Sequence, residues 1–171
     1  PVLYLPYIIY PAKIKRQTGL LIPSIGYSNE GGEEITLPFF WAISENMDAT
    51  FSLDYRSKRG VGEALEYRYI FSRNSSGNLY LYNMREMNSY RDWKEERKGK
   101  KLISGLDRTM LRYQHEQYFD PSFYAKADVA HISDREFFRD FSKIVDDRST
   151  EKLESTVFTT KVWRKFNLNS E

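Results

Sequence analysis

The chain has 171 residues, of which 40% are hydrophobic, 29% charged and 16% aromatic, so it is too apolar and too aromatic to be an intrinsically disordered segment. With 26 basic and 24 acidic residues its formal net charge is +2, and charge alone does not require nucleic acid or another polyanion as a partner. The absence of cysteine excludes disulfides and thiolate metal sites within these residues.

Charged or strongly polar residues interrupt every hydrophobic segment, so no stretch approaches the roughly 18 apolar residues of a transmembrane helix. The chain begins at Pro1 without an initiator methionine or a signal peptide, and we expect it to be an interior piece of a longer or processed chain. Its mean hydropathy of -0.65 suits a soluble domain. It equally suits a membrane β-barrel, in which only alternate residues face lipid.

Eight segments have the composition and length of β-strands. The clearest is residues 48–56, where apolar and polar side chains alternate in strict period two. Within the usual boundary error, each segment is about the 9 to 11 residues that a tilted strand needs to cross a bilayer. In chain order the predicted strands are residues 20–27, 33–41, 48–56, 65–71, 79–87, 109–119, 123–132 and 155–166.

The connections differ between the two ends of these strands. Short polar turns are predicted at one end, whereas residues 88–106 and 133–153 form long charged connections at the other. This asymmetry is typical of outer-membrane barrels. Within the second long connection, residues 134–145 carry phenylalanines at helical spacing and predict a short loop helix. The short turns are predicted at residues 44–47, 73–78 and 120–122.

These patterns predict an all-β fold, namely antiparallel, up-and-down strands of a transmembrane β-barrel. Aromatic residues near the predicted strand ends favour it, because amphipathic rings rest at the membrane interface. The same aromatics would also suit the core of a soluble β-sandwich, such as a glycan-binding module. The pattern of residues leaves that alternative open, and it does not separate an active transport protein from a passive porin-like barrel.

Little in the sequence indicates catalysis. His115 and His131 lack the partner spacing of a metal-binding helix, and no pair stands out among the 24 acidic residues. We therefore predict no enzymatic activity, no metal and no cofactor. The basic cluster at residues 91–101 is interleaved with acidic residues, so we interpret it as a solvated loop rather than a nucleic-acid site. In an outer-membrane protein, these cations would also be able to contact phosphorylated lipid headgroups.

The prolines are more informative. Five of the six lie within the first 38 residues, and Pro23 and Pro38 lie inside predicted strands, where the missing N–H removes a ladder hydrogen bond. An unpaired backbone group in hydrocarbon costs several kcal/mol, so such a pairing would be weak in a closed barrel. It would then be able to open. The alternative is that these prolines block aggregation at the edge of a domain.

Several motifs, in order and spacing, resemble the LptD family of lipopolysaccharide-assembly proteins, also called organic solvent tolerance proteins. The resemblance is dense over residues 1–72 and again over 123–145, whereas residues 83–106 depart freely from it. The motifs are Pro1-Val-Leu-Tyr-Leu-Pro-Tyr, Gly19-Leu-Leu-Ile-Pro-Ser, Leu37-Pro-Phe-Phe-Trp-Ala-Ile-Ser-Glu-Asn-Met-Asp-Ala-Thr, Ser57-Lys-Arg-Gly, Glu66-Tyr-Arg-Tyr and Ile132-Ser-Asp-Arg-Glu-Phe-Phe-Arg-Asp-Phe.

The resemblance implies an outer-membrane protein of a Gram-negative bacterium in which a periplasmic β-jellyroll precedes a barrel of about 26 strands. Residues 1–12 would be the end of the jellyroll and the hinge, and residues 13–171 the first eight or so strands. The family's partners would be lipopolysaccharide, the lipoprotein plug LptE, the periplasmic bridge protein LptA and outer-membrane lipid. The N-terminal end would be periplasmic, which makes residues 29–32, 58–62, 88–106 and 133–153 extracellular.

The resemblance also implies a transport path, in which sugars pass through a polar lumen and acyl chains leave through a lateral gate at the first barrel strand. Pro23 would weaken the hydrogen bonding beside that gate, Pro38 lies in the next predicted strand, and Pro6 and Pro11 would stiffen the hinge. Alternation along the strands predicts which polar residues face the lumen. They are Thr50, Ser52, Asp54, Arg56, Glu66, Arg68, Lys126 and Asp128.

Overall fold

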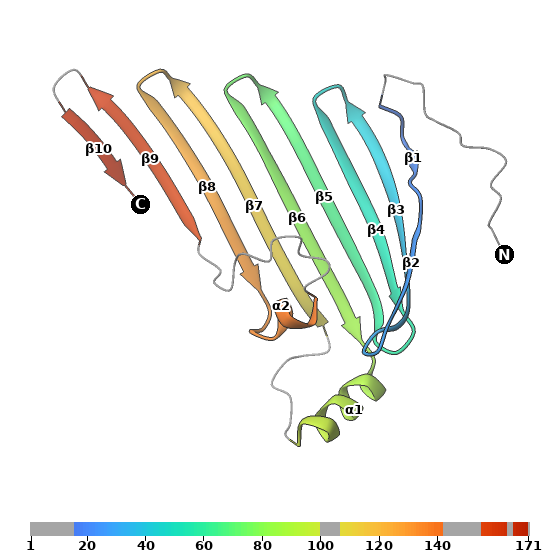
Figure 1. Cartoon of the computed structure of the whole chain (residues 1–171). Coiled ribbons are helices and arrows are strands. Elements are labelled where there is room, and N and C mark those ends of the chain that lie inside the picture. Colours follow the sequence, from blue (N-terminus) through green and yellow to red (C-terminus); the bar gives the residue numbers. More distant parts are fainter. Residues whose placement is uncertain (1–15, 100–106, 142–154, 164–165, 171) are drawn as a thin grey trace, which may run out of the picture.

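The computed structural model describes residues 16–99, 107–141, 155–163 and 166–170. In this part of the chain, ten strands form one antiparallel sheet, and from β3 onward each strand pairs with its neighbours in sequence (Figure 1). The elements are β1 (Gly19–Leu20), β2 (Ser24–Ser28), β3 (Gly32–Ser44), β4 (Met47–Arg56), β5 (Gly60–Ser72), β6 (Ser75–Glu86), α1 (Asn88–Lys98), β7 (Asp107–Asp120), β8 (Phe123–Ile132), α2 (Phe137–Asp140), β9 (Thr156–Trp163) and β10 (Phe166–Ser170).

The strand register divides the sheet into two chemically different faces. From β2 to β9, apart from the bulges, every register pair joins two even-numbered or two odd-numbered residues, as in Asp54↔Gly62 and Phe51↔Leu65. Because directly opposite residues point to the same side, even-numbered residues share one face and odd-numbered residues the other. The predicted alternation of β4 is thus repeated across the sheet.

The two ends of the sheet also differ. Tight connections between β3 and β4, β5 and β6, and β7 and β8 lie at one end, here called the turn end, and α1 and α2 lie at the other, the helix end (Figure 1). Each tight connection at the turn end is accompanied by a register shift, at 42/44, 70/72 and 118/120. The predicted asymmetry between short turns and long connections is therefore confirmed.

Several of the sequence-based boundaries were wrong, among them the start of the strand predicted over residues 65–71, because β5 begins at Gly60. The predicted first strand, residues 20–27, is broken into β1 and β2, and the predicted last strand, 155–166, ends at Trp163 before β10 begins. The predicted turn at 73–78 contains only Arg73 and Asn74, because residues 75–77 already pair with β5 and β7. Residue 77 is a glycine within this strand, and a Cβ at this position would collide with the ring of Tyr69 on the neighbouring strand.

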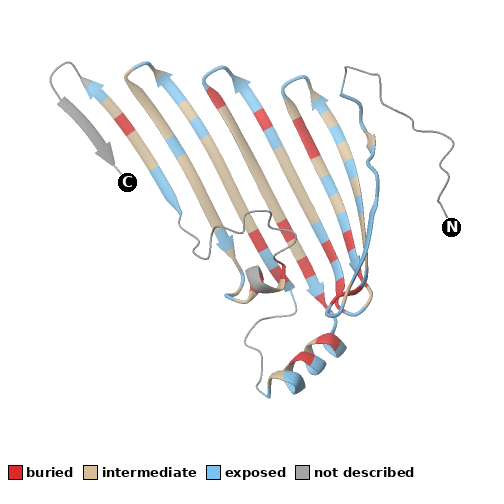
Figure 2. Ribbon diagram, in the orientation of Figure 1, coloured by how far each residue is buried: buried red, intermediate tan, exposed pale blue. Residues whose placement is uncertain are grey.

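Both long connections contain helices in their described parts. Residues 88–98 were interpreted as a loop and instead form α1, which ends at Gly99 in the left-handed conformation (φ 62°). The helix predicted over 134–145 is described only as far as Phe141, and α2 covers Phe137–Asp140. Figure 2 shows that buried residues gather where α1, α2 and the helix-end halves of β4 to β7 meet.

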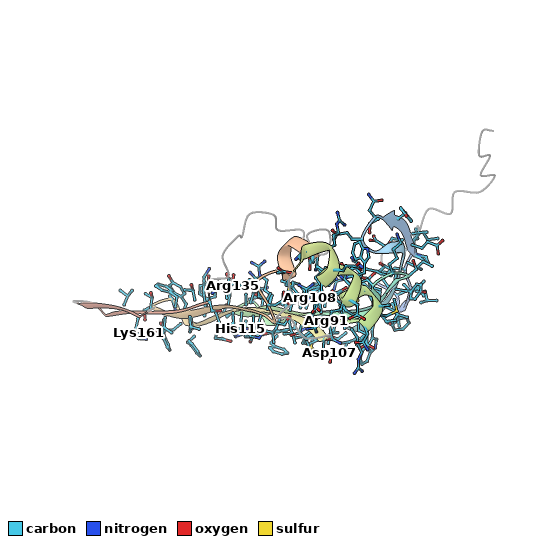
Figure 3. All side chains as sticks on the ribbon, turned by 90° about the horizontal axis from the view of Figure 1, so that it is seen from below. Arg91, Asp107, Arg108, His115, Arg135 and Lys161 are labelled. Carbon is cyan, nitrogen blue, oxygen red and sulfur yellow. The ribbon has the colours of Figure 1, made fainter. Side chains whose placement is uncertain are left out.

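The buried apolar cluster lies on the even-numbered face, under α2. Tyr82 and Met84 of β6, Met110 of β7, and Phe137 and Phe141 of the α2 segment pack together. In the edge-on view the sheet carries α2 on one side (Figure 3). A sheet with a cover over only part of one face leaves the whole opposite face uncovered within the described chain.

Candidate functional site

The odd-numbered face is apolar and exposed. Leu37, Phe39 and Trp41 of β3, with Phe51 and Leu53 of β4, are each between 38% and 46% exposed, although large apolar side chains in water-soluble folds are normally covered. Neighbouring rings pack against one another along this face, as do Trp41 and Phe51, whose centroids are 6.5 Å apart. On β3 and β4 this face therefore offers an apolar surface to its surroundings.

The even-numbered face is polar over most of its area. It brings together all eight side chains that were predicted to line a lumen, because each lies at an even-numbered position of β4, β5 or β8. Asp54 accepts hydrogen bonds from Arg56 Nε (3.1 Å) and Tyr82 Oη (2.9 Å). Asp48 of the same strand binds Arg68 Nε at 2.7 Å and Arg16 at 2.6 Å. The polar side chains thus interact along the face rather than standing alone.

The pairing of β1 and β2 with β3, here called the first seam, contains both described candidate gate prolines, Pro23 and Pro38. The register runs from Leu20↔Phe39 to Ser24↔Thr36, so residues 21–23 lie opposite residues 37 and 38. This is a bulge of one extra residue, and Pro23 lies in the break between β1 and β2. Within this bulge, a backbone hydrogen bond still crosses the seam from Leu21 N to Pro38 O (2.9 Å).

Pro38 weakens the same place from the opposite strand. In an antiparallel ladder the N–H and C=O of one residue point to the same neighbour. Because the carbonyl of Pro38 points to Leu21, the donor that proline lacks is missing on the side of the first seam and not toward β4. Pro6 and Pro11, the other two candidate residues, lie outside the described residues.

A buried ionic cluster at the helix end was not predicted from the sequence. It consists of Arg59, Glu86, Lys94, Arg108, Asp134 and Asp140. Arg59 donates from Nε and Nη2 to Glu86 Oε1 (2.8 and 2.6 Å), and Arg108 donates from Nε and Nη2 to Asp134 (2.9 and 2.7 Å). Both arginine side chains are only 1% exposed. Buried charges of this kind are tolerated only when they are paired and hydrogen-bonded.

The α2 segment, residues 133–141, joins this cluster through Asp134 and through Asp140. The Asp140 carboxylate pairs with Lys94 of α1 and with Arg108 of β7, and Arg59 also donates to the backbone carbonyl of Asp140 at 3.2 Å. Burial alone would raise the pKa of Asp140, but hydrogen bonds from Lys94 and Arg108 outweigh burial and hold it below its ordinary value. The carboxylate is therefore charged at neutral pH.

Aromatic rings complete the attachment of the α2 segment. The ring of Phe141 has the guanidinium groups of Arg59, Arg108 and Arg56 at 4.0, 5.1 and 5.5 Å from its centroid. A second ion pair, from Lys98 Nζ to Glu136 at 2.8 Å, ties α1 to the α2 segment. Lys94 and Lys98 are thus partly buried and paired, and the described part of this basic stretch is helical, which corrects its interpretation as a solvated loop; residues 100 and 101 of the stretch (91–101) lie outside the described residues.

The sequence contained a partial signal for this cluster. Phe137 and Phe141 have the i, i+4 spacing that predicted a loop helix, and both are buried. No local sequence pattern identified Arg59, Glu86 or Arg108 as cluster members, because each resembles an ordinary charged residue near a strand end. Their partners come from 22 to 81 residues away, so hydrophobic periodicity carries no information about them.

The two histidines occupy different surroundings. His115 Nδ1 hydrogen-bonds Tyr69 Oη at 2.9 Å, beside the hydroxyl of Tyr113, and His131 is exposed. Within the described ranges, no group of three histidine, cysteine, aspartate or glutamate side chains is arranged to hold a metal ion. The described helices are too short or too polar to cross a membrane.

A single antiparallel sheet with an apolar exposed face, a polar opposite face, tight turns at one end and longer connections at the other is typical of the wall of an outer-membrane β-barrel. The comparisons with known proteins agree with this class. The family model described as LptD protein matches residues 1–171, and the chain therefore belongs to the LptD protein family.

Three relatives illustrate the similarity. The LPS-assembly protein LptD of Aeromonas salmonicida is 33% identical over 174 residues, which cover 100% of this chain and 21% of that protein. LPS-assembly protein LptD of Shewanella frigidimarina is 30% identical, with 90% of this chain and 18% of the relative covered. The protein of the same name from an Azoarcus species is 33% identical, with 85% and 16% covered. The chain thus spans about a fifth of the length of these curated relatives.

Proposed function

We propose that this chain forms the first part of the barrel wall of an outer-membrane translocon that inserts lipopolysaccharide into the outer leaflet. Its family membership and the name of its relatives support this role. The apolar face would contact the hydrocarbon of the membrane, and the polar face would line a hydrated path through the barrel. Transport of this kind makes and breaks no covalent bond, and we propose no enzymatic activity.

The cargo requires two different paths. Each CH₂ group of an acyl chain that leaves an apolar environment costs about 0.8 kcal/mol, so exposing several chains to water is prohibitive. Sugars, in contrast, need hydrogen-bonding partners throughout. In our proposal the sugars travel along the polar face beside residues such as Asp54 and Glu66, while the acyl chains leave sideways between strands.

The observation that carries the proposal is the first seam. Pro23 and Pro38 fall in one interruption of the ladder, on its two sides, and the apolar side chains of Leu20, Ile22 and Ile25 beside it are between 80% and 92% exposed. Each ladder bond broken in hydrocarbon costs several kcal/mol, so a gate is cheapest where donors are already missing. We propose that acyl chains leave at this seam.

The orientation follows from the same assignment. With a periplasmic N-terminus, residues 1–12 would form the end of a jellyroll and a hinge that includes Pro6 and Pro11, and the helix end of the sheet would be extracellular. The upstream jellyroll would receive lipopolysaccharide from LptA, and LptE would occupy the barrel. The α2 segment on the polar face would then lie inside the extracellular mouth.

Two other functions make different demands on the molecule. A soluble β-sandwich needs a second sheet over its apolar face, whereas the described residues form one sheet. A passive porin conducts solutes through its lumen and does not require its strands to separate. Requirement for detergent during extraction separates the sandwich from both barrels, and copurification of a lipoprotein plug separates the translocon from the porin.

Pro23→Val in the full-length protein tests the proposal. Valine favours strands and restores a backbone donor, so the first seam should tighten and delivery of lipopolysaccharide should slow. Cells that depend on the variant should carry less surface lipopolysaccharide and become more sensitive to detergent. Pro121→Ala is the matched control, because Pro121 lies in the turn between β7 and β8, far from the seam. Unchanged surface lipopolysaccharide and detergent sensitivity in the Pro23→Val strain would refute the gate.

A further inference from the structure

The strand made of β1 and β2, here called the first strand, is held differently at its two ends. At the helix end, a tight turn joins β2 to β3, and residues 24–28 pair with residues 32–36 without a break (Figure 1). At the turn end, the chain enters β1 instead of turning back, and of the described residues there only Gly19 and Leu20 pair with β3. The turn end is therefore where the first strand would peel away most easily.

Two side-chain contacts hold this end in place of a turn. Thr18 Oγ1 accepts a hydrogen bond from the backbone N–H of Ala42 on β3 (3.0 Å), and Arg16 Nη1 donates to Asp48 Oδ2 on β4 (2.6 Å). The second contact reaches past β3, where Ala42, the residue opposite Asp48, presents only a methyl group on that face. Between described residues, Arg16–Asp48 is the one ion pair that joins residues 16–28 to the rest of the sheet.

The carboxylate of Asp48 is a fixed point of the sheet. Its side chain is 4% exposed, and each of its oxygens binds one arginine: Oδ1 accepts from Arg68 Nε (2.7 Å) and Oδ2 accepts from Arg16. Arg68 lies directly opposite on β5, so it ties the carboxylate to the part of the sheet with an unbroken register. Because a buried carboxylate is destabilised by the loss of a charged partner, Asp48 holds Arg16 more firmly than an exposed acid would, although Arg16 itself is 59% exposed.

The bulge of the first seam lies between these two held ends. Residues 21–23 fall in the interrupted register, and the neighbouring apolar side chains of Leu20 and Ile25 are exposed. A strand that is held at both ends and poorly paired between them separates most readily in its middle. The contact between Asp48 and Arg16 thus determines whether a separation that starts at the bulge can spread to the turn end.

We propose that Asp48 is a positioning residue of the lateral gate: by holding Arg16, it clamps the turn end of the first strand and confines strand separation to the bulge. The proposal rests on the proposed function, in which the turn end lies at the periplasmic leaflet of the membrane. A first strand that peeled from that end would open the barrel wall to the periplasmic leaflet. With the clamp in place, the opening stays farther toward the outer leaflet, which is where the acyl chains of lipopolysaccharide must arrive.

Amide hydrogen exchange in the full-length protein, purified in detergent, tests the clamp. Arg16→Gln removes the charge but keeps a polar side chain, and it should accelerate exchange at residues 19–21 roughly fivefold, because the Leu21 N–H stays bonded to Pro38 O only while the strands are paired. Exchange at residues 24–28, beside the tight turn, should stay within about twofold of the unmodified protein. The difference between the two segments is the signature of peeling from the turn end.

Three further variants separate the clamp from a general structural role. Arg68→Gln is the matched control for exchange, because it removes the other arginine from the same carboxylate without touching the first strand, and residues 19–21 should exchange as before. Arg16→Lys should restore slow exchange, since an ammonium group can still pair with Asp48. Asp48→Asn should match Arg16→Gln at residues 19–21, and the double variant should add nothing there, because both changes remove one contact.

Two outcomes of the exchange experiment would overturn the clamp: unchanged exchange at residues 19–21 in Arg16→Gln, or equal acceleration over residues 19–28, which would mean a general loosening. Cells that depend on Arg16→Gln should also become more sensitive to detergent, and Arg16→Lys should rescue them. Full detergent resistance despite accelerated exchange would show that the clamp has no part in the gate. The exchange measurements do not depend on transport, so an unmodified protein that delivers no lipopolysaccharide would refute the proposed function and leave the clamp itself in place.

Discussion

The first seam and the helix-end part of β4 to β7 are built from the same kind of strand but are held in opposite ways. At the seam, β1 and β2 pair with β3 through an interrupted register, and Ile22 is 92% exposed. Between β4 and β5 the register runs without a break from Met47↔Tyr69 to Arg56↔Gly60. The chain therefore distributes its strand pairing unevenly, with the weak place at the first strands.

The difference extends beyond the ladder to what covers each region. The helix end of β4 to β7 is close-packed: Gly60 has φ +144° and so little room that a Cβ would collide with the carbonyl of Arg85 on the next strand. The α2 segment then adds apolar and ionic contacts. Nothing in the described chain covers the first seam in this way. A rigid region beside a weak one confines any opening to the weak one.

The largest effect should come from Arg108→Met, which would break the rigid region. Removing this cation leaves Asp134 and Asp140 without their shared partner in a buried site, and such losses cost about 3–5 kcal/mol. We expect the α2 segment to detach, with amide exchange of residues 133–141 accelerated more than a hundredfold in the full-length protein. Arg85→Met is the matched control, because the Arg85–Asp107 pair is exposed. Unchanged exchange in Arg108→Met would mean that the ionic cluster does not hold the segment.

Asp140→Asn should have a smaller effect that depends on pH. The folded pKa of Asp140 lies below its ordinary value of about 3.9, so its contribution is fully present above that pH and is lost as pH falls toward the folded pKa. At neutral pH the variant should open the α2 segment more readily by about 2 kcal/mol, because Asn accepts hydrogen bonds without charge.

The pH profile distinguishes this effect from general damage. Amide exchange of residues 133–141 should accelerate below about pH 4 in the unmodified protein and should be nearly independent of pH in the Asn variant, after correction for intrinsic exchange. A profile in the variant that keeps the full acid-induced opening would assign the titration to another carboxylate, and Asp140 would then not be the titrating link.

The strands were predictable from sequence because their signal is local. Alternation identified β4 over residues 48–56 and β8 over 123–132, and the same alternation placed the eight predicted polar residues on one face. The turn at 73–78 was misplaced because Ser76 and Asn78 resemble turn residues, although they only point to the polar face. Residue type alone does not distinguish a polar residue in a turn from a polar residue on the polar face of a strand.

Helix α1 and the ionic cluster were not predictable, because their signal is long-range. The buried residues of α1 are Tyr90 and Lys94, and a lysine at a buried position breaks the hydrophobic pattern by which helices are recognised. Lys94 is buried because Asp140, 46 residues away, neutralises it. The interruption at Pro23 was predicted as a weakness, but the bulge that brings Pro23 into the same interruption as Pro38 depends on the register with β3.

Pro38→Val tests the same comparison by strengthening the first seam. The new N–H would point toward the first seam and gain a partner there, which adds about 1 kcal/mol to pairing and slows amide exchange of residues 19–28 roughly fivefold. Because Pro23 and Pro38 act at one interruption, the double variant Pro23→Val/Pro38→Val should not show the sum of the two single effects. Strictly additive effects would place the two prolines in independent gates.

The smallest effect should come from Lys126→Ala, on the polar face outside the α2 cover. Lys126 Nζ contacts Glu116 at 2.8 Å, about as close as the pairs of the ionic cluster, but both side chains are nearly half exposed, and solvent screening leaves such pairs with little effect on stability. Amide exchange of β7 and β8 should therefore stay within about twofold of the unmodified protein. A loss comparable to that of Arg108→Met would show that ion pairs stiffen this face wherever they occur. A negligible loss would leave burial under α2 as the reason that this part of the sheet is held more firmly than the first seam, at which we propose the gate.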